Sequence, residues 1–125
     1  ALATRWPEAV NAALTRYLAE AGIEVIACRS RARSLEENKH SSAADDHLLA
    51  LELGGQVLRE TPDAQALLMP GGLWYAIHAV PVLEAAHGRP VLLNILSTTW
   101  AALHAAGERM LHRPDPRWGK VLASL

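Results

Sequence analysis

Apolar positions follow two different spacings along the chain. Segments in which they recur three or four residues apart predict amphipathic helices. Short apolar runs without that period predict strands that are covered on both faces. The predicted helices cover residues 7–21, about 43–60, 73–87 and 97 or 98 to 106, and the predicted strands cover residues 23–28, 66–69 and 91–95.

Helices and strands alternate in this pattern, and the connections between them are only a few residues long. This order predicts an α/β fold in which a parallel sheet forms the middle of a three-layer sandwich and the crossovers are right-handed. Pro81 falls inside the third predicted helix, so we expect it to kink that helix or to limit its first turns.

The predicted sheet is short of strands. Three are few for a sheet covered on both faces, and the chain starts at Ala1, without a methionine, almost directly on the first helix. We therefore expect that upstream sequence is missing and that it includes a first strand. Residues 1–107 form the predicted lobe, and residues 108–125, interrupted by Pro114 and Pro116, form a tail expected to pack on a partner lobe or on another chain.

Composition removes several function classes. A chain of 125 residues, half of them apolar, can bury one modest core. A formal charge of -1 provides no basic surface for nucleic acid, and no apolar run approaches the roughly 20 residues needed to span a bilayer. The single cysteine, Cys28, excludes an internal disulfide and is most simply a core residue. With no signal-peptide pattern at its start, the protein is expected in the cytoplasm.

Two strand ends carry candidate chemistry. After the strand at 66–69, two glycines permit a tight turn and let backbone amides approach an anion, although an ordinary strand-to-helix turn has the same pattern. After the strand at 91–95, an amide and hydroxyls could bind a carboxylate, or could simply cap the next helix. Because parallel strands end at one edge of the sheet, we expect one shared pocket. The candidate substrate-binding residues are Pro70, Gly71, Gly72, Leu73, Trp74, Asn94, Ser97 and Thr98.

An acidic pair, Asp45 and Asp46, stands at the start of the second predicted helix. Carboxylates there oppose the positive end of the helix dipole, which favours a capping role. His40 and His47 lie nearby, but the spacing matches no metal-ligand pattern, so no metal site is predicted.

Several short motifs, taken in order, resemble the second half of proteins of the aspartate/glutamate racemase superfamily, in its maleate isomerase and arylmalonate decarboxylase branch. They include a proline-aspartate-alanine lead into a strand, a leucine-glutamate pair before glycine-x-proline-valine, and a tryptophan-alanine-alanine-leucine helix. The segments that carry the resemblance are Gly22–Ala27, Pro62–Gly72, Leu83–Val91, Thr99–Leu103, Gly107 and Trp118–Leu122.

This resemblance implies a flavodoxin-like lobe that faces a second, missing lobe. It also implies chemistry next to the carboxylate of a small carboxylic acid, without metal or pyridoxal phosphate and with a cysteine at a strand end. Amides and hydroxyls of both lobes would hold the carboxylate and stabilise an enolate-like intermediate.

The sequence departs from the family pattern at the cysteine position. After the strand at 66–69 stands Gly71, with Pro70 before it, and glycine offers neither a proton nor a nucleophile. Cys28 belongs to another strand, and His78 is expected to face solvent or packing. The catalytic residue is therefore unassigned. Either a cysteine in the missing lobe carries out isomerisation, racemisation or decarboxylation, or this lobe is an inactive carboxylate-binding or assembly module. A phosphate-binding domain ranks last, because Gly71-Gly72 lacks phosphate-loop spacing.

Overall fold

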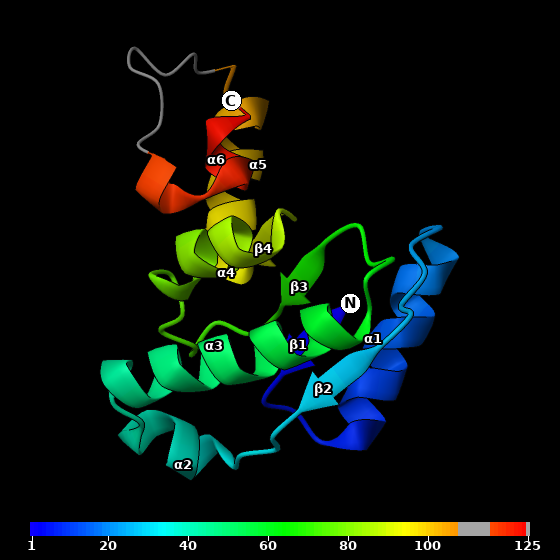
Figure 1. The fold of residues 1–125 in the computed structure, drawn as a ribbon, viewed down its shortest axis with the longest axis vertical. Coiled ribbons are helices and arrows are strands. Elements are labelled where there is room, and N and C mark those ends of the chain that lie inside the picture. The colour runs from blue at the N-terminus through cyan, green and yellow to red at the C-terminus, as the bar shows by residue number, and fades with distance from the viewer. Residues whose placement is uncertain (108–115, 125) are drawn as a thin grey trace.

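A computed structural model describes residues 1–107 and 116–124, which form an α/β fold around one parallel sheet (Figure 1). The sheet has four strands in the order β2-β1-β3-β4. The strands are β1 (Leu2–Thr4), β2 (Cys28–Ser30), β3 (Leu67–Met69) and β4 (Val91–Leu93). The helices are α1 (Glu8–Glu20), α2 (Leu35–His40), α3 (Ala43–Glu60), α4 (Ala79–His87), α5 (Asn94–Ala105), the 3-10 helix η1 (Pro116–Trp118) and α6 (Lys120–Ala123).

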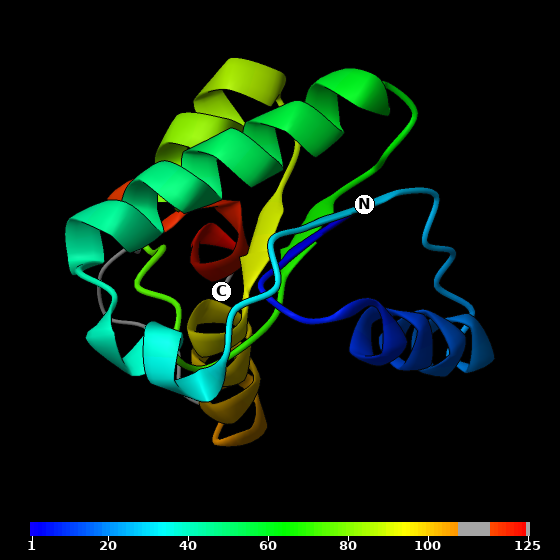
Figure 2. The ribbon, with the colours of Figure 1, turned by 90° about the horizontal axis from the view of Figure 1, so that it is seen from below.

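The elements are stacked in three layers. In Figure 2, α3 and α4 lie on one side of the strands, whereas α1 and α5 lie on the other. The predicted α/β sandwich with a parallel sheet is therefore confirmed. Among the described helices, none is both long and apolar enough to cross a membrane.

The expectation that the first strand precedes Ala1 is wrong. Leu2–Thr4 form β1, which lies between β2 and β3 and has three buried residues. Three residues are too few to show a period of their own, so the pattern along the chain passed over them. The fourth strand of the described sheet is therefore β1, which lies within the sequence.

Other boundaries also moved. The strand predicted at residues 23–28 is Cys28–Ser30, because pairing with β1 begins at Cys28, opposite Leu2. The apolar residues before it are exposed instead, with Ile23 54% and Ile26 44% accessible. In the third unit, α4 begins only at Ala79 and has Pro81 in its first turn, where a missing N–H costs no helical hydrogen bond. The polar segment after β2 contains a short helix, α2, that the pattern did not predict.

The main core lies between the sheet and helices α3 and α4. Alternate residues of β3 and β4 are buried in it, as expected for a strand period of two: Leu67, Met69, Val91 and Leu93. Gly54 of α3 permits a close approach of the helices, because a Cβ at that position would lie 2.9 Å from Leu83 Cδ1 of α4.

The opposite side of the sheet is less covered. The predicted apolar face of α1 is largely accessible: Asn11 is its one buried residue in the structure, and Val10 and Tyr17 are 42% and 69% exposed. Next to α5, an apolar groove of about 580 Å³ is lined by residues of β4, α5 and α6 and their flanks. The lining residues are Pro90, Leu92, Ser97, Trp100, Ala101, Lys120, Val121 and Ser124.

The C-terminal segment is fastened to this same lobe. Buried Glu84 of α4 accepts hydrogen bonds from the Val91 amide at 3.0 Å and from the Lys120 amide at 2.9 Å, and Trp100 Nε1 donates to Ser124 Oγ at 3.1 Å. Packing of residues 108–125 on a partner stays a prediction, and residues 108–115 and 125 lie outside the described part of the chain.

Candidate functional site

A cavity of about 300 Å³ lies where three neighbouring strands end. Its walls come from the segments that follow β1, β2 and β3, together with α2. Parallel α/β folds bind ligands at this edge of the sheet, because the loops that follow the carboxyl ends of neighbouring strands lie side by side there. The lining residues are Arg5, Trp6, Arg33, Leu35, Asn38, Pro70, Gly71, Gly72 and Leu73.

Backbone pairing brings the first two walls together. Beyond β2, the chain stays hydrogen-bonded to the continuation of β1: the Arg31 amide donates to Thr4 O and the Arg33 amide donates to Arg5 O, both at 3.1 Å. Arg5 and Arg33, which are far apart in sequence, therefore enter the cavity as neighbours.

The third wall is a bare stretch of backbone. Gly71 has φ of 110°, a conformation that side-chain-bearing residues rarely adopt, and a Cβ there would lie 3.7 Å from the Trp6 ring. The amides of Gly71, Gly72 and Leu73 donate to no acceptor within the described residues. Unpaired amides beside a cavity require water or a ligand acceptor, and consecutive ones form an anion-binding concavity.

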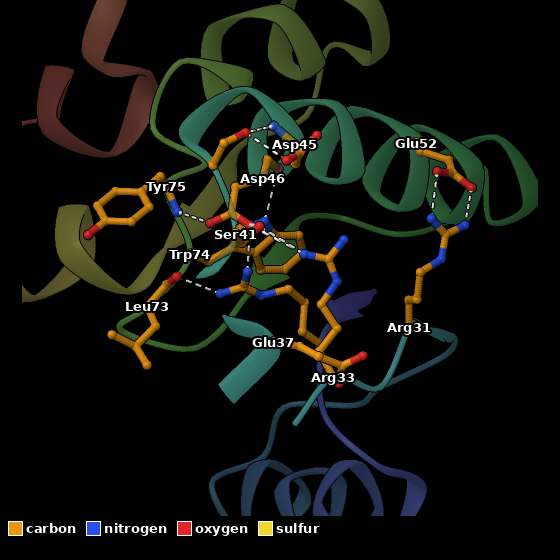
Figure 3. Close-up of polar contacts among 12 residues, drawn as sticks. Arg31, Arg33, Glu37, Ser41, Asp45, Asp46, Glu52, Leu73, Trp74 and Tyr75 are labelled. Carbon is orange, nitrogen blue, oxygen red and sulfur yellow. Dashed lines mark hydrogen bonds and ion pairs between the residues drawn. The ribbon is translucent and has the colours of Figure 1, made fainter. Parts of the chain in front are cut away.

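Asp46 organises the charges behind the cavity (Figure 3). Its carboxylate is fully buried and accepts hydrogen bonds from Arg5 Nη1 at 2.6 Å, from Ser41 Oγ at 2.6 Å and from the Tyr75 amide at 3.0 Å. Because three donors converge on Asp46, this residue ties α3, Arg5 and the segment after β3 into one unit. Asp45, its neighbour, is exposed in the first turn of α3 and accepts a hydrogen bond from the capping Ser42, so the role predicted for the pair applies to Asp45 and not to Asp46.

Arg5 is held on several sides. Besides Asp46, it donates from Nη2 to Leu73 O at 2.5 Å and lies 5.2 Å from the centroid of the Trp74 ring. Burial lowers the pKa of Arg5, the Arg33 charge acts in the same direction, and Asp46 opposes both. Through its contacts with Leu73 and Trp74, Arg5 holds the loop after β3 in place.

The structure brings together half of the predicted site. Pro70, Gly71, Gly72 and Leu73 line the cavity, whereas Trp74 is buried behind it and donates from Nε1 to Asp46 O at 3.0 Å.

The second predicted strand end does not reach this cavity. Asn94, Ser97 and Thr98 are absent from its lining, and Ser97 lines the apolar groove instead. The physical reason is that α5 begins at Asn94, directly after β4, so no loop is left to turn these side chains toward β3. The shared pocket expected from both strand ends is therefore corrected to a pocket on β1, β2 and β3.

Sequence reasoning did not identify five of the lining residues: Arg5, Trp6, Arg33, Leu35 and Asn38. Arg5 and Trp6 follow the strand that the pattern missed, and Asn38 belongs to the helix that it missed. The sequence marks these positions only as basic and polar segments after each strand, and no motif links the two segments.

The lining contains no cysteine, histidine or carboxylate among the described residues. Cys28 stands at the start of β2, opposite to the end that opens on the cavity. His78 is exposed and precedes α4. The described part of the chain thus offers the cavity donors and cations, but no ordinary proton-transfer group.

Cys28 should therefore behave as a structural thiol. Burial raises its pKa, opposed by the nearby Arg29 charge, so less thiolate is present at pH 8 than in an unfolded chain. We expect iodoacetamide to alkylate Cys28 several-fold more slowly in the native than in the urea-unfolded protein, measured by mass spectrometry. Cys28→Ser should leave ligand affinity unchanged, and a loss of affinity in this variant would contradict its placement away from the site.

Comparisons with known proteins agree with this architecture. The chain is 29% identical over 114 residues to the arylmalonate decarboxylase of Bordetella bronchiseptica, an alignment that covers 91% of this chain and 46% of that protein. The structure of unliganded arylmalonate decarboxylase matches 100% of this chain and 51% of its own, with a TM-score of 0.81 and 28% identity. The maleate isomerase from Pseudomonas putida shares the fold, with a TM-score of 0.72 and 24% identity over 98% of this chain and 46% of that one.

The chain spans about half the length of these relatives. A family model described as arylmalonate decarboxylase matches residues 1–117. The resemblance to the aspartate/glutamate racemase superfamily is thereby confirmed, and the chain belongs to the arylmalonate decarboxylase family.

Proposed function

We propose that this chain is one lobe, the C-terminal one, of a cofactor-independent enzyme that acts next to the carboxylate of a small carboxylic acid. The observation that carries the proposal is the cavity at the ends of β1, β2 and β3, which is lined by two arginines and by three residues whose amides donate to no described acceptor. Two relatives support the proposal, because one is named for the decarboxylation of arylmalonates and the other for the isomerisation of maleate.

The lobe would act by binding and by electrostatic stabilisation. Amides of Gly71, Gly72 and Leu73 would donate to a carboxylate oxygen, and would donate more strongly as negative charge moves onto that oxygen in an enolate-like state. Trp6 would pack against the ligand beside Gly71 and exclude water from one side. Donors fixed before the reaction need no reorganisation when the charge develops.

The proton-transfer group would come from outside this lobe. The described lining supplies none, and the relatives contain about as much chain again. The accessible apolar face of α1 and the groove beside α5 are the surfaces that we assign to the covering lobe, whether it belongs to the same protein or to another chain.

An inactive carboxylate-binding module is the second candidate, and the observation that favours it is the absence of any acid or base from the described lining. In that case the cavity would still bind its anion, but no bond would change. The two candidates share a ligand class and differ only in turnover.

Two measurements on the full-length protein separate them. Calorimetry with maleate, aspartate, glutamate and phenylmalonate should detect binding of at least one acid. Turnover, or exchange of the proton next to the carboxylate in deuterated water, should accompany it if the protein is an enzyme. Binding without turnover or exchange would establish the module, and absence of binding by all four acids would contradict both candidates.

A further inference from the structure

Three arginines alternate along the chain at and beyond β2, at positions 29, 31 and 33. Alternate residues of an extended segment point to the same side, so all three face α3. Arg29 Nη2 lies 2.6 Å from Glu60 Oε2, and Arg31 donates from both terminal nitrogens to the two Glu52 oxygens (Figure 3). The first two arginines therefore have carboxylate partners of their own.

Arg33 is different, because the carboxylate it faces is already occupied. Asp46 Oδ1 accepts from Arg5 Nη1 and Ser41 Oγ, both at 2.6 Å, and Arg33 Nη1 stays 3.8 Å from it. The one hydrogen bond that its guanidinium makes to the described residues is from Nη1 to Ser41 Oγ at 2.9 Å. Most of its donors therefore have no acceptor in the described part of the chain.

This cation is partly withdrawn from water, with 24% of its side chain exposed, and it lines the cavity. A partly desolvated guanidinium that retains unused donors gains most from a carboxylate that it can bind through two nitrogens. Glu37 lies near it, but this carboxylate is exposed and accepts the Ser34 amide in the capping box of α2, so solvent screens it from the cavity.

Asn38 supplies a second, independent observation on the same wall. Its Oδ1 is buried without a hydrogen-bond partner, and its side-chain nitrogen, Nδ2, donates to no described acceptor. Either orientation of the side-chain amide thus leaves a polar atom without a partner among the described residues, on a residue that lines the cavity together with Arg33.

We propose that Arg33 is a specificity-determining residue, which selects substrates that have a second carboxylate in addition to the one at the Gly71 and Gly72 amides. Asn38 contributes a hydrogen bond to this second group. Ser41 is a positioning residue, because it holds Arg33 Nη1 while its own hydroxyl is anchored on Asp46. This inference rests on the proposed function, since it assigns the second end of the same ligand.

Calorimetry with a matched pair of acids tests it on the full-length protein. Maleate and (Z)-but-2-enoate have the same carbon skeleton and double-bond geometry, and differ by a carboxylate in place of a methyl group. We expect wild type to bind maleate more tightly by about tenfold or more, which corresponds to one charge-assisted contact. Arg33→Met should remove this preference and leave the affinity for (Z)-but-2-enoate unchanged.

Arg31→Met is the matched control, because Arg31 alternates with Arg33 but does not line the cavity and should not alter the preference. Arg33→Lys should retain part of the preference, and Ser41→Ala should reduce it by severalfold. Equal weakening of both acids by Arg33→Met, or an unchanged preference, would overturn the inference while leaving the carboxylate site intact. Failure of wild type to bind maleate would overturn this inference, and failure to bind aspartate, glutamate and phenylmalonate as well would overturn the proposed function.

Discussion

Replacing Asp46 with alanine is expected to destabilise the fold by about 3–5 kcal/mol, the range for removal of one partner from a buried ion pair. The variant would leave the buried Arg5 guanidinium without its carboxylate and would remove the acceptor of Ser41 and of the Tyr75 amide. Urea denaturation followed by tryptophan fluorescence measures the loss directly.

Asp45→Ala is the matched control for this prediction. Asp45 is also an acidic residue in the first turn of α3, but it is exposed and interacts only with Ser42 among the described residues, so its loss should cost below about 1 kcal/mol. Equal losses in the two variants would show that helix-dipole electrostatics, rather than the buried network, accounts for the contribution of Asp46.

Replacing Glu84 with alanine is expected to cost about 2–3 kcal/mol. The Val91 amide at the start of β4 and the Lys120 amide at the start of α6 both donate to this carboxylate, and both would lose their acceptor in the protein. Leaving a buried backbone donor unpaired costs more than the hydrogen bond contributes in net terms. The free energy of unfolding should therefore fall, and hydrogen exchange should accelerate at Lys120.

Glu84→Gln and Glu52→Ala provide the comparison. The glutamine retains one acceptor oxygen and should lose about half as much stability as the alanine. Glu52 is on the exposed surface, paired with Arg31, and its removal should cost about 0–1 kcal/mol. A loss in Glu84→Ala no greater than in Glu52→Ala would mean that the C-terminal segment does not depend on this buried carboxylate.

The helices were predictable to the extent that their own residues determine them. The apolar spacing of α3 and the acidic pair at its start are local signals, and the structure places that helix at Ala43–Glu60. The strands are three residues long, and their bounds depend on which residues find a partner. Leu2–Thr4 became a strand because β2 and β3 flank it, whereas the residues from Ile23 to Ala27 precede the described ladder, which begins with Cys28 opposite Leu2.

The candidate site divides in the same way. Two consecutive glycines, Gly71 and Gly72, indicate by their identity alone a tight turn or a close backbone approach, so the wall after β3 could be predicted. The Arg5, Arg33 and Asp46 cluster joins three separate segments, and no spacing in the sequence encodes it. Asp46 illustrates the limit: its position predicted a helix-capping role shared with Asp45, whereas burial turned it into the acceptor that holds Arg5.

The exposed face of α1 has a related explanation. The helix was predicted correctly from its apolar positions, but the described chain leaves Val10 and Tyr17 accessible. An apolar stripe predicts that something covers it, and the sequence cannot specify what that is. The relatives, about twice as long, make a second lobe our proposed cover.

The most direct test of the account is amide and indole NMR of the protein during a maleate titration. The cavity at the ends of β1, β2 and β3 predicts that the largest shifts occur at the amides of Gly71 and Gly72 and at the Trp6 indole, with little change at the Trp100 indole in the apolar groove. Shifts centred on Trp100, or a spectrum that neither maleate nor aspartate, glutamate or phenylmalonate changes, would contradict the proposed carboxylate site.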